Sequence, residues 1–306
     1  MIRKMFLCVT VLFLFTNINL FAQDEKDSTE SKWYNWGDHE WFHWEFHGKP
    51  FIELNYGFGT PKQSKLVSKY ADVGVAELKL GYASRDSYYE ESIIQFHDKF
   101  AFASKLSADL KSSTATLGEM KSDLWRFGFA NRTGYGYKMK DVSILLYHGE
   151  GFVWSKLDMK DYPAQFYYAL NPPMSIDDAI HDTDILNRFH DAFRFGTVNE
   201  GGVKFEVASF VSLDAGYEMS VIFPRHLFWK HLGSYIIEKG ADGLLNHFID
   251  EVADSSPYAG PIVDFVLRNG LSYAFFALKK DNMNWPFATE APLTYETFKF
   301  GITFTF

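Results

Sequence analysis

The eleven C-terminal residues, 296–306, constrain the fold most, because apolar and polar side chains alternate along them. They read E-T-F-K-F-G-I-T-F-T-F, and the apolar positions are Phe298, Phe300, Ile302, Phe304 and Phe306. Alternate side chains of a β-strand point to opposite faces, so the segment predicts a strand with one oily and one polar face. The oily face either packs on a second sheet or faces lipid, and about 9–11 residues suffice for a membrane-spanning strand.

A last strand of alternating hydrophobic residues that ends in Phe306 resembles the insertion signal of Gram-negative outer-membrane β-barrel proteins. The segment Phe21-Ala22-Gln23 resembles the end of leaders that are common in Bacteroidota. The resemblance implies an outer-membrane location, contact with outer-membrane lipid, and recognition of the last strand by the barrel-insertion machinery. It implies no particular subfamily.

Residues 1–22 predict a signal peptide. Arg3 and Lys4 form a basic start, an apolar stretch follows over 6–15, and cleavage is expected after Ala22. Cys8 is the single cysteine and lies inside this leader. The mature chain is therefore expected to lack thiols, which excludes disulfides, thiolate catalysis and cysteine metal sites.

Composition favours spanning strands over spanning helices. Aromatic residues make up 18% of the chain, yet mean hydropathy is −0.18. Strands whose oily and polar residues alternate give this combination, because the two faces cancel on average. The formal net charge of −9 argues against a nucleic-acid partner, since binders of nucleic acid need a basic patch.

Residues 23–48 predict a periplasmic linker rich in Trp and His. His39, His43 and His47 recur every four residues, a spacing that on a helix places them on one face and makes them weak metal-ligand candidates. The alternative is an aromatic segment at the membrane interface with solvated histidines. No metal is expected there, because no further ligand or carboxylate partner is visible.

Residues 49–306 predict an all-β membrane protein, an antiparallel transmembrane β-barrel of 8–10 strands. Nine alternating runs lie at 51–58, 76–82, 94–102, 125–129, 142–146, 203–207, 211–221, 271–275 and 296–306. Bacterial barrels have an even number of strands. The count becomes eight if 203–223 is one long strand, or ten if 152–157 adds another.

Two helical inserts interrupt the strands, at about 172–197 and 224–270. Ser175 predicts the cap of the first insert, with Asp177 and Asp178 in its first turn. The second insert predicts three short helices with apolar stripes. These helices are expected to pack together, against a barrel mouth, or into the bilayer interface.

The polar parity of the strands predicts a network of charges in the barrel lumen. Its expected members are Glu53, Glu77, Lys79, Lys99, Arg126, Arg132, Lys204, Glu206, Asp214, Glu218 and Lys299. Acids and bases nearly balance, which suits a narrow lumen filled by ion pairs, because an unpaired buried charge is costly. The alternative is an open sheet with a wet polar face, but its long edges would stay exposed.

The sequence predicts no catalytic residues and no cofactor. His148, with Ser143 and Glu150 nearby, is the best local candidate for hydrolysis, but Ser143 and His148 have opposite strand parity. Two function classes remain. The favoured class is a non-enzymatic outer-membrane barrel: a structural element, a ligand-binding surface, or a narrow conduit for small or apolar molecules. The alternative is an outer-membrane lipid-modifying hydrolase or acyltransferase, which a rim cluster of Ser, His and acid would favour.

Overall fold

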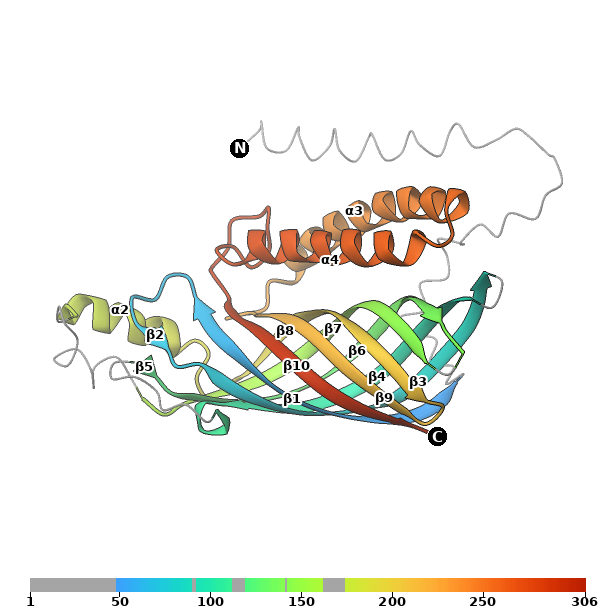
Figure 1. Cartoon of the computed structure of the whole chain (residues 1–306). Helices are drawn as coiled ribbons and strands as arrows, with labels where there is room; N and C mark the ends of the chain where they lie inside the picture. The colour runs from blue at the N-terminus through green and yellow to red at the C-terminus, as the bar shows by residue number, and fades with distance from the viewer. Residues whose placement is uncertain (1–47, 90–91, 112–118, 141, 162–173) are drawn as a thin grey trace, which may run out of the picture. The chain divides into compact units, whose positions relative to one another are not determined.

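The described part of the chain forms a closed antiparallel barrel of eight strands (Figure 1). The computed structural model describes residues 48–89, 92–111, 119–140, 142–161 and 174–306. Around the barrel the strand order is β1-β10-β9-β8-β7-β6-β4-β3. The strands are β1 (Lys49–Gln63), β3 (Val73–Tyr89), β4 (Ile93–Ser107), β6 (Ser122–Lys138), β7 (Ser143–Met159), β8 (Phe193–Ala208), β9 (Val211–Ile222) and β10 (Leu293–Thr305). The leader and the linker with His39, His43 and His47 lie outside the described residues.

The predicted fold class is confirmed, and the strand number is the lower of the two predicted. Runs 142–146 and 152–157 are parts of one strand, β7, whereas 203–207 and 211–221 belong to two separate strands. The prediction of a strand at 271–275 is wrong, because these residues lie within helix α4 (Gly260–Lys279). With only three alternating apolar residues, the run is too short for its periodicity to decide between a strand and a helix.

The closing strand joins the two ends of the described chain. β10 pairs with β1 in antiparallel register, with Phe300 opposite Tyr56 and Phe298 opposite Phe58. The rings of Phe58 and Phe298 lie 5.9 Å apart on the outer face. Closure removes both edges of the barrel sheet, which satisfies the backbone groups that an open sheet would leave unpaired.

The two ends of the barrel differ in the length of their connections. At the end that carries residues 48 and 306, here called the terminal end, only residues 209 and 210 join β8 to β9. The opposite, far end carries the long connections. They include the two-stranded sheet of β2 (Lys69–Tyr70) and β5 (Glu119–Met120), the 3-10 turn η2 (Ala108–Leu110), and helices α2 (Ile176–Leu186), α3 (Phe228–Ser255) and α4.

The first helical insert has the predicted cap. Ser175 precedes α2, and its hydroxyl accepts a hydrogen bond from the backbone N–H of Asp178 at 3.0 Å. Asp177 and Asp178 lie in the first turn, where they interact favourably with the helix dipole. The buried residues Ile185 and Leu186 of α2 turn toward the far-end opening of the barrel.

The second insert differs from the prediction of three short helices. It holds two long antiparallel helices, α3 and α4, which form a helical hairpin (Figure 1). The hairpin packs on the outside of the barrel and not inside its mouth. Met219 and Val221 point outward from β9, and both are buried in one cluster with Phe276 of α4. In the part of the chain that the structure describes, no helix is long and apolar enough to cross a membrane.

Candidate functional site: an ion-pair network inside the barrel

The alternation of each strand decides which charged side chains enter the barrel. Inward positions are odd on β1, β3, β7 and β10, and even on β4, β6, β8 and β9. The structure accordingly places ten of the eleven predicted charges on the inner face: Glu53, Glu77, Lys79, Arg126, Arg132, Lys204, Glu206, Asp214, Glu218 and Lys299. All but Glu206 are buried. An eight-stranded barrel has an interior just wide enough for side chains to fill.

For β4, the sequence prediction placed the wrong set of alternate residues inside the barrel. Lys99 is exposed on the outer face, whereas its neighbour Asp98 is fully buried inside. The inward positions of β4 also carry Phe96, Phe100 and Phe102, which the alternation of the sequence assigned to lipid. These aromatic rings point inward because they contact the cations of the network.

The cations of the network thus contact aromatic rings in addition to carboxylates. The guanidinium of Arg132 lies 4.4 Å from the ring centre of Tyr147 and 5.2 Å from that of Phe100. Lys79 lies 5.0 Å from the ring centre of Phe100. A cation over an aromatic face is stabilised further when water is excluded.

Lys299 forms the centre of the network. Its Nζ donates to carboxylate oxygens of Glu77 at 2.8 Å, Glu200 at 2.6 Å and Glu218 at 2.7 Å. Oxygen atoms of these three carboxylates lie within 4.8 Å of one another, a grouping that resembles a metal site. The ammonium of Lys299 takes the position that a cation would take, and it is the group that contacts all three acids.

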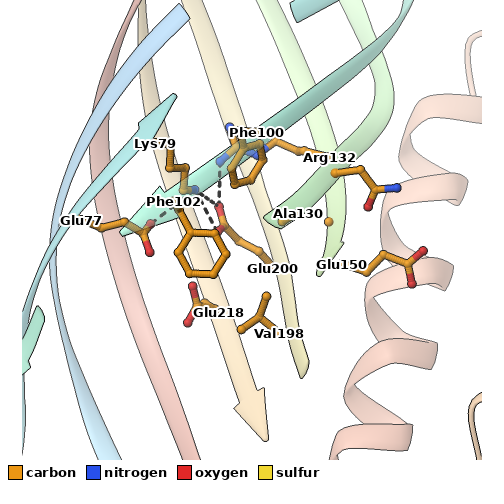
Figure 2. Close-up of a pocket in the computed structure, with 12 residues that line it drawn as sticks. Glu77, Lys79, Phe100, Phe102, Ala130, Arg132, Glu150, Val198, Glu200 and Glu218 are labelled. Atoms are coloured by element: carbon orange, nitrogen blue, oxygen red, sulfur yellow. Dashed lines mark hydrogen bonds and ion pairs between the residues drawn. The ribbon is translucent and has the colours of Figure 1, made fainter. Parts of the chain in front are cut away.

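A second centre forms around Arg132 (Figure 2). Its guanidinium donates to both oxygens of Glu53, at 3.0 and 3.1 Å, and to Glu200 at 3.0 Å. Lys79 donates to both oxygens of Glu200, at 3.0 and 3.1 Å, and Figure 2 shows Lys79 and Arg132 converging on this carboxylate. The Tyr147 hydroxyl lies 3.0 Å from Glu200 and 2.9 Å from Asp214. Bidentate Arg–carboxylate pairs are geometrically specific, so these contacts fix the side chains in place.

Three charged members of the network are absent from the sequence prediction. Glu200, Asp98 and Arg85 lie on the inner face, and Arg85 donates to Asp98 at 2.7 Å and to Glu206 at 2.9 Å. Glu200 has the same parity as Lys204, which indicates the inner face, but Gly201 and Gly202 separate it from the alternating run at 203–207. Asp98 lies among Phe96, Phe100 and Phe102 on the same face of β4. A carboxylate among these apolar residues indicates that this face is the inner one.

An apolar layer closes the barrel at its far end. This cluster, here called the apolar cap, joins inward residues of the strands to residues of α2 and the two-stranded sheet. It comprises Tyr70, Val73, Val75, Leu106, Met120, Leu124, Leu157, Met159, Ile185, Leu186, Phe189, Ile222, Leu293 and Tyr295. Below it, a cavity of about 10 Å³ lies beside Glu77, Glu200 and Glu218. That volume corresponds to roughly one water molecule.

The hydrolytic candidate residues do not assemble. Ser143 and His148 lie at positions of opposite parity on β7, as the sequence predicted, and therefore face opposite sides of the barrel wall. His148 points outward, and its Nε2 lies 3.2 Å from the Thr133 hydroxyl. Glu150 also points outward and accepts from Lys239 of α3 at 2.6 Å. Ser143 is therefore out of reach of His148, and the predicted group of Ser143, His148 and Glu150 does not form.

Comparison with known proteins gives likeness in fold alone. No family model matches the chain, and a search of curated proteins found no match. Among solved structures, the Neisserial surface protein A matches with a TM-score of 0.39 and 10% identity, over 84% of this chain and 97% of that chain. The attachment invasion locus protein of Yersinia pestis, solved with the heparin analogue sucrose octasulfate, matches with a TM-score of 0.32 and 10% identity. That match covers 85% of this chain and 99% of the other.

Proposed function

We propose that this protein is a non-enzymatic outer-membrane β-barrel that acts as a closed structural element of the membrane. The network around Lys299 carries the proposal, because it fills the cross-section with paired charges and leaves no route of one sign for a solute. A selective pore instead lines its path with a ring of like charges or a field of carbonyls. The apolar cap adds a second barrier in series at the far end.

The outer face of the barrel supports the membrane location. Large apolar side chains stand exposed in alternation along several strands, where water would disfavour them. They include Ile52, Leu54, Tyr56, Phe58, Leu78, Leu80, Trp125, Phe127, Phe129, Leu213, Phe298 and Phe300. An exposed apolar belt of this extent marks a surface that meets lipid or another protein. Short turns of outer-membrane barrels lie in the periplasm, so the terminal end is assigned there and the far end outside.

The proposed partners follow from the same arrangement. Outer-membrane lipid surrounds the exposed belt, and the barrel-insertion machinery recognises β10 through Phe298, Phe300, Ile302, Phe304 and Phe306. We expect the mature protein in the outer-membrane fraction, with heat-modifiable mobility on gels. Recovery as a soluble periplasmic protein would overturn the proposal.

Planar bilayer recordings test the closed interior. We expect no stable channels from the wild type, because the ion-pair network and the apolar cap block the lumen one after the other. Replacing Phe189 of the cap with serine is expected to leave the barrel closed, since the network remains. Adding Arg126→Ser, which removes a side chain that contacts Glu77 and Glu218, is expected to produce conducting events.

The control for these recordings is Phe189→Ser combined with Lys49→Ser, because Lys49 is exposed and lies outside the network. This control is expected to stay silent. Heat-modifiability establishes that every variant is folded before it is recorded. Large, stable wild-type channels would contradict the closed barrel and favour a porin.

A further inference from the structure

The hairpin of α3 and α4 extends along the full height of the barrel wall. α3 follows β9 at the far end, and the hairpin tip reaches the terminal end. There the Tyr137 hydroxyl donates to the backbone carbonyl of Tyr258 at 2.6 Å, and the rings of Tyr89 and Tyr258 lie 5.8 Å apart. α4 then returns to the far end, where Phe276 packs on β9. The hairpin therefore lies at the same level as the strands.

The polar side of the hairpin faces the wall. Lys239 of α3 donates to both carboxylate oxygens of Glu150 at 2.6 Å. Asn269 of α4 donates to the backbone carbonyl of Tyr147 at 3.2 Å. Glu150 and His148 interrupt an outward run of β7 that is otherwise apolar from Ile144 to Trp154. The hairpin covers the part of the wall that is least compatible with hydrocarbon.

The opposite side of the hairpin presents an apolar band. Every exposed position of α3 between residues 232 and 246, and of α4 between 262 and 278, is apolar or glycine: Leu232, Ile236, Ile237, Leu244, Ile262, Val266, Gly270, Tyr273, Ala274, Ala277 and Leu278. At about 1.5 Å per residue these stretches are roughly 21–24 Å long, close to the apolar band of about 25 Å on outer-membrane barrels.

Exposed charges lie beyond both ends of this band. Asp250, Glu251 and Asp254 are exposed near the hairpin tip, and Arg225 and Lys230 are exposed at the far end. An apolar band between two charged ends is the pattern of a surface that passes from headgroups through hydrocarbon to headgroups. A surface meant for water would carry charges in the middle as well.

We propose that the outer side of the α3–α4 hairpin contacts lipid acyl chains, so that the hairpin forms part of the hydrocarbon-facing wall. Only this side meets lipid, because the polar sides of both helices face the barrel and neither helix is apolar enough to cross a membrane alone. This inference rests on the proposed membrane location. The hairpin continues the belt of exposed apolar side chains on the barrel, and it seals the polar wall around His148 and Glu150 from lipid. The occupant of its outer face is bilayer hydrocarbon.

Single-cysteine labelling tests the inference. Cys8 lies in the expected leader, so the mature protein offers a background without thiols. Leu244→Cys and Val266→Cys report on the hairpin, Phe300→Cys on the barrel belt, and Val67→Cys on a far-end connection; all four positions are exposed. Each variant carries a bimane label in proteoliposomes, and its fluorescence is quenched by brominated acyl chains or by aqueous iodide.

We expect labels at 244 and 266 to be quenched by brominated lipid as strongly as the label at 300, and the label at 67 only by iodide. Iodide quenching at 244 and 266 together with lipid quenching at 300 would overturn the hairpin inference and leave the membrane location intact. Iodide quenching at 300 would overturn the membrane location itself. Shielding of 244 and 266 from both quenchers would overturn lipid as the occupant and indicate a protein partner.

Two ion pairs of similar exposure give an independent measurement; of their two acids, Glu296 also accepts a hydrogen bond from the Tyr217 hydroxyl. Lys239–Glu150 lies within the band at 2.6 Å, and Lys280–Glu296 lies at the far end at 2.5 Å, with nearly equal exposed fractions. Both lysines also lie over an aromatic ring. In bilayers, Lys239→Leu is expected to reduce the folding equilibrium constant at least about tenfold more than Lys280→Leu, because it leaves Glu150 without its partner where water is excluded. Equal losses would contradict the inference.

Discussion

Replacing Lys299 with methionine is expected to destabilise the barrel by about 3–5 kcal/mol, because removal of one partner leaves buried charges uncompensated. The three carboxylates around Nζ, those of Glu77, Glu200 and Glu218, would then repel one another in the barrel interior. Methionine keeps a similar length, so the loss reports charge and not volume. Urea unfolding in lipid vesicles, followed by tryptophan fluorescence, measures the change.

Two variants control for the effect of Lys299. Lys49→Met removes an exposed lysine from β1 and is expected to cost less than about 1 kcal/mol. Lys299→Met combined with Glu200→Gln removes one of the stranded acids and is expected to recover part of the loss. Calcium is also expected to stabilise Lys299→Met but not the wild type, because three close carboxylate oxygens suit that ion. A loss as small as that of Lys49→Met would show that the network contributes little.

Replacing Phe300 with arginine is expected to destabilise the barrel by about 2–4 kcal/mol if the outer face meets lipid near mid-bilayer. Phe300 lies on the outer face of β10 with 57% of its surface exposed. In water, an exposed phenylalanine at this position could be replaced by arginine at little cost. Unfolding in vesicles compared with unfolding of the wild type gives the difference.

Phe210→Arg is the matched control for Phe300→Arg. Phe210 is 60% exposed but lies in the β8–β9 turn at the terminal end. The cost of arginine on a lipid face falls to about 0–1 kcal/mol near the interfaces, so little change is expected. Equal costs at the two positions would mean that the belt is not in contact with hydrocarbon.

Side-chain alternation predicted most of the barrel because register is tied to burial. A shift by one residue moves a whole strand face from the inside to the outside, so β1 and β10 could be assigned from their parity alone. The same rule failed on β4, where Phe100 and Asp98 share the inner face. Cations in the barrel interior can contact aromatic rings as well as carboxylates. A strand face made of aromatic residues therefore does not by itself indicate contact with lipid.

The hairpin could be predicted only in part. The apolar stripes of α3 indicated helices, but their partner surface depends on β7, which is distant in the sequence. The signal lay in His148 and Glu150, polar residues at outward positions between Leu146 and Phe152. Polar residues at outward positions of a membrane strand indicate that another part of the protein covers them. The pairing of Lys239 with Glu150 spans 89 residues, and no local pattern specifies it.

The contacts between the first and last strands set the order in which the barrel can assemble. Thr303 donates to Glu53 across 250 residues of sequence, and Lys299 donates to Glu77 across 222. Neither contact exists until β10 arrives beside β1, so Glu53 and Glu77 lack these two donors until then. Loop-closure entropy makes such distant pairing late and cooperative. We therefore expect assembly to pass through an open sheet with a hydrated inner face, and the interior to dry in the step that joins the first strand to the last.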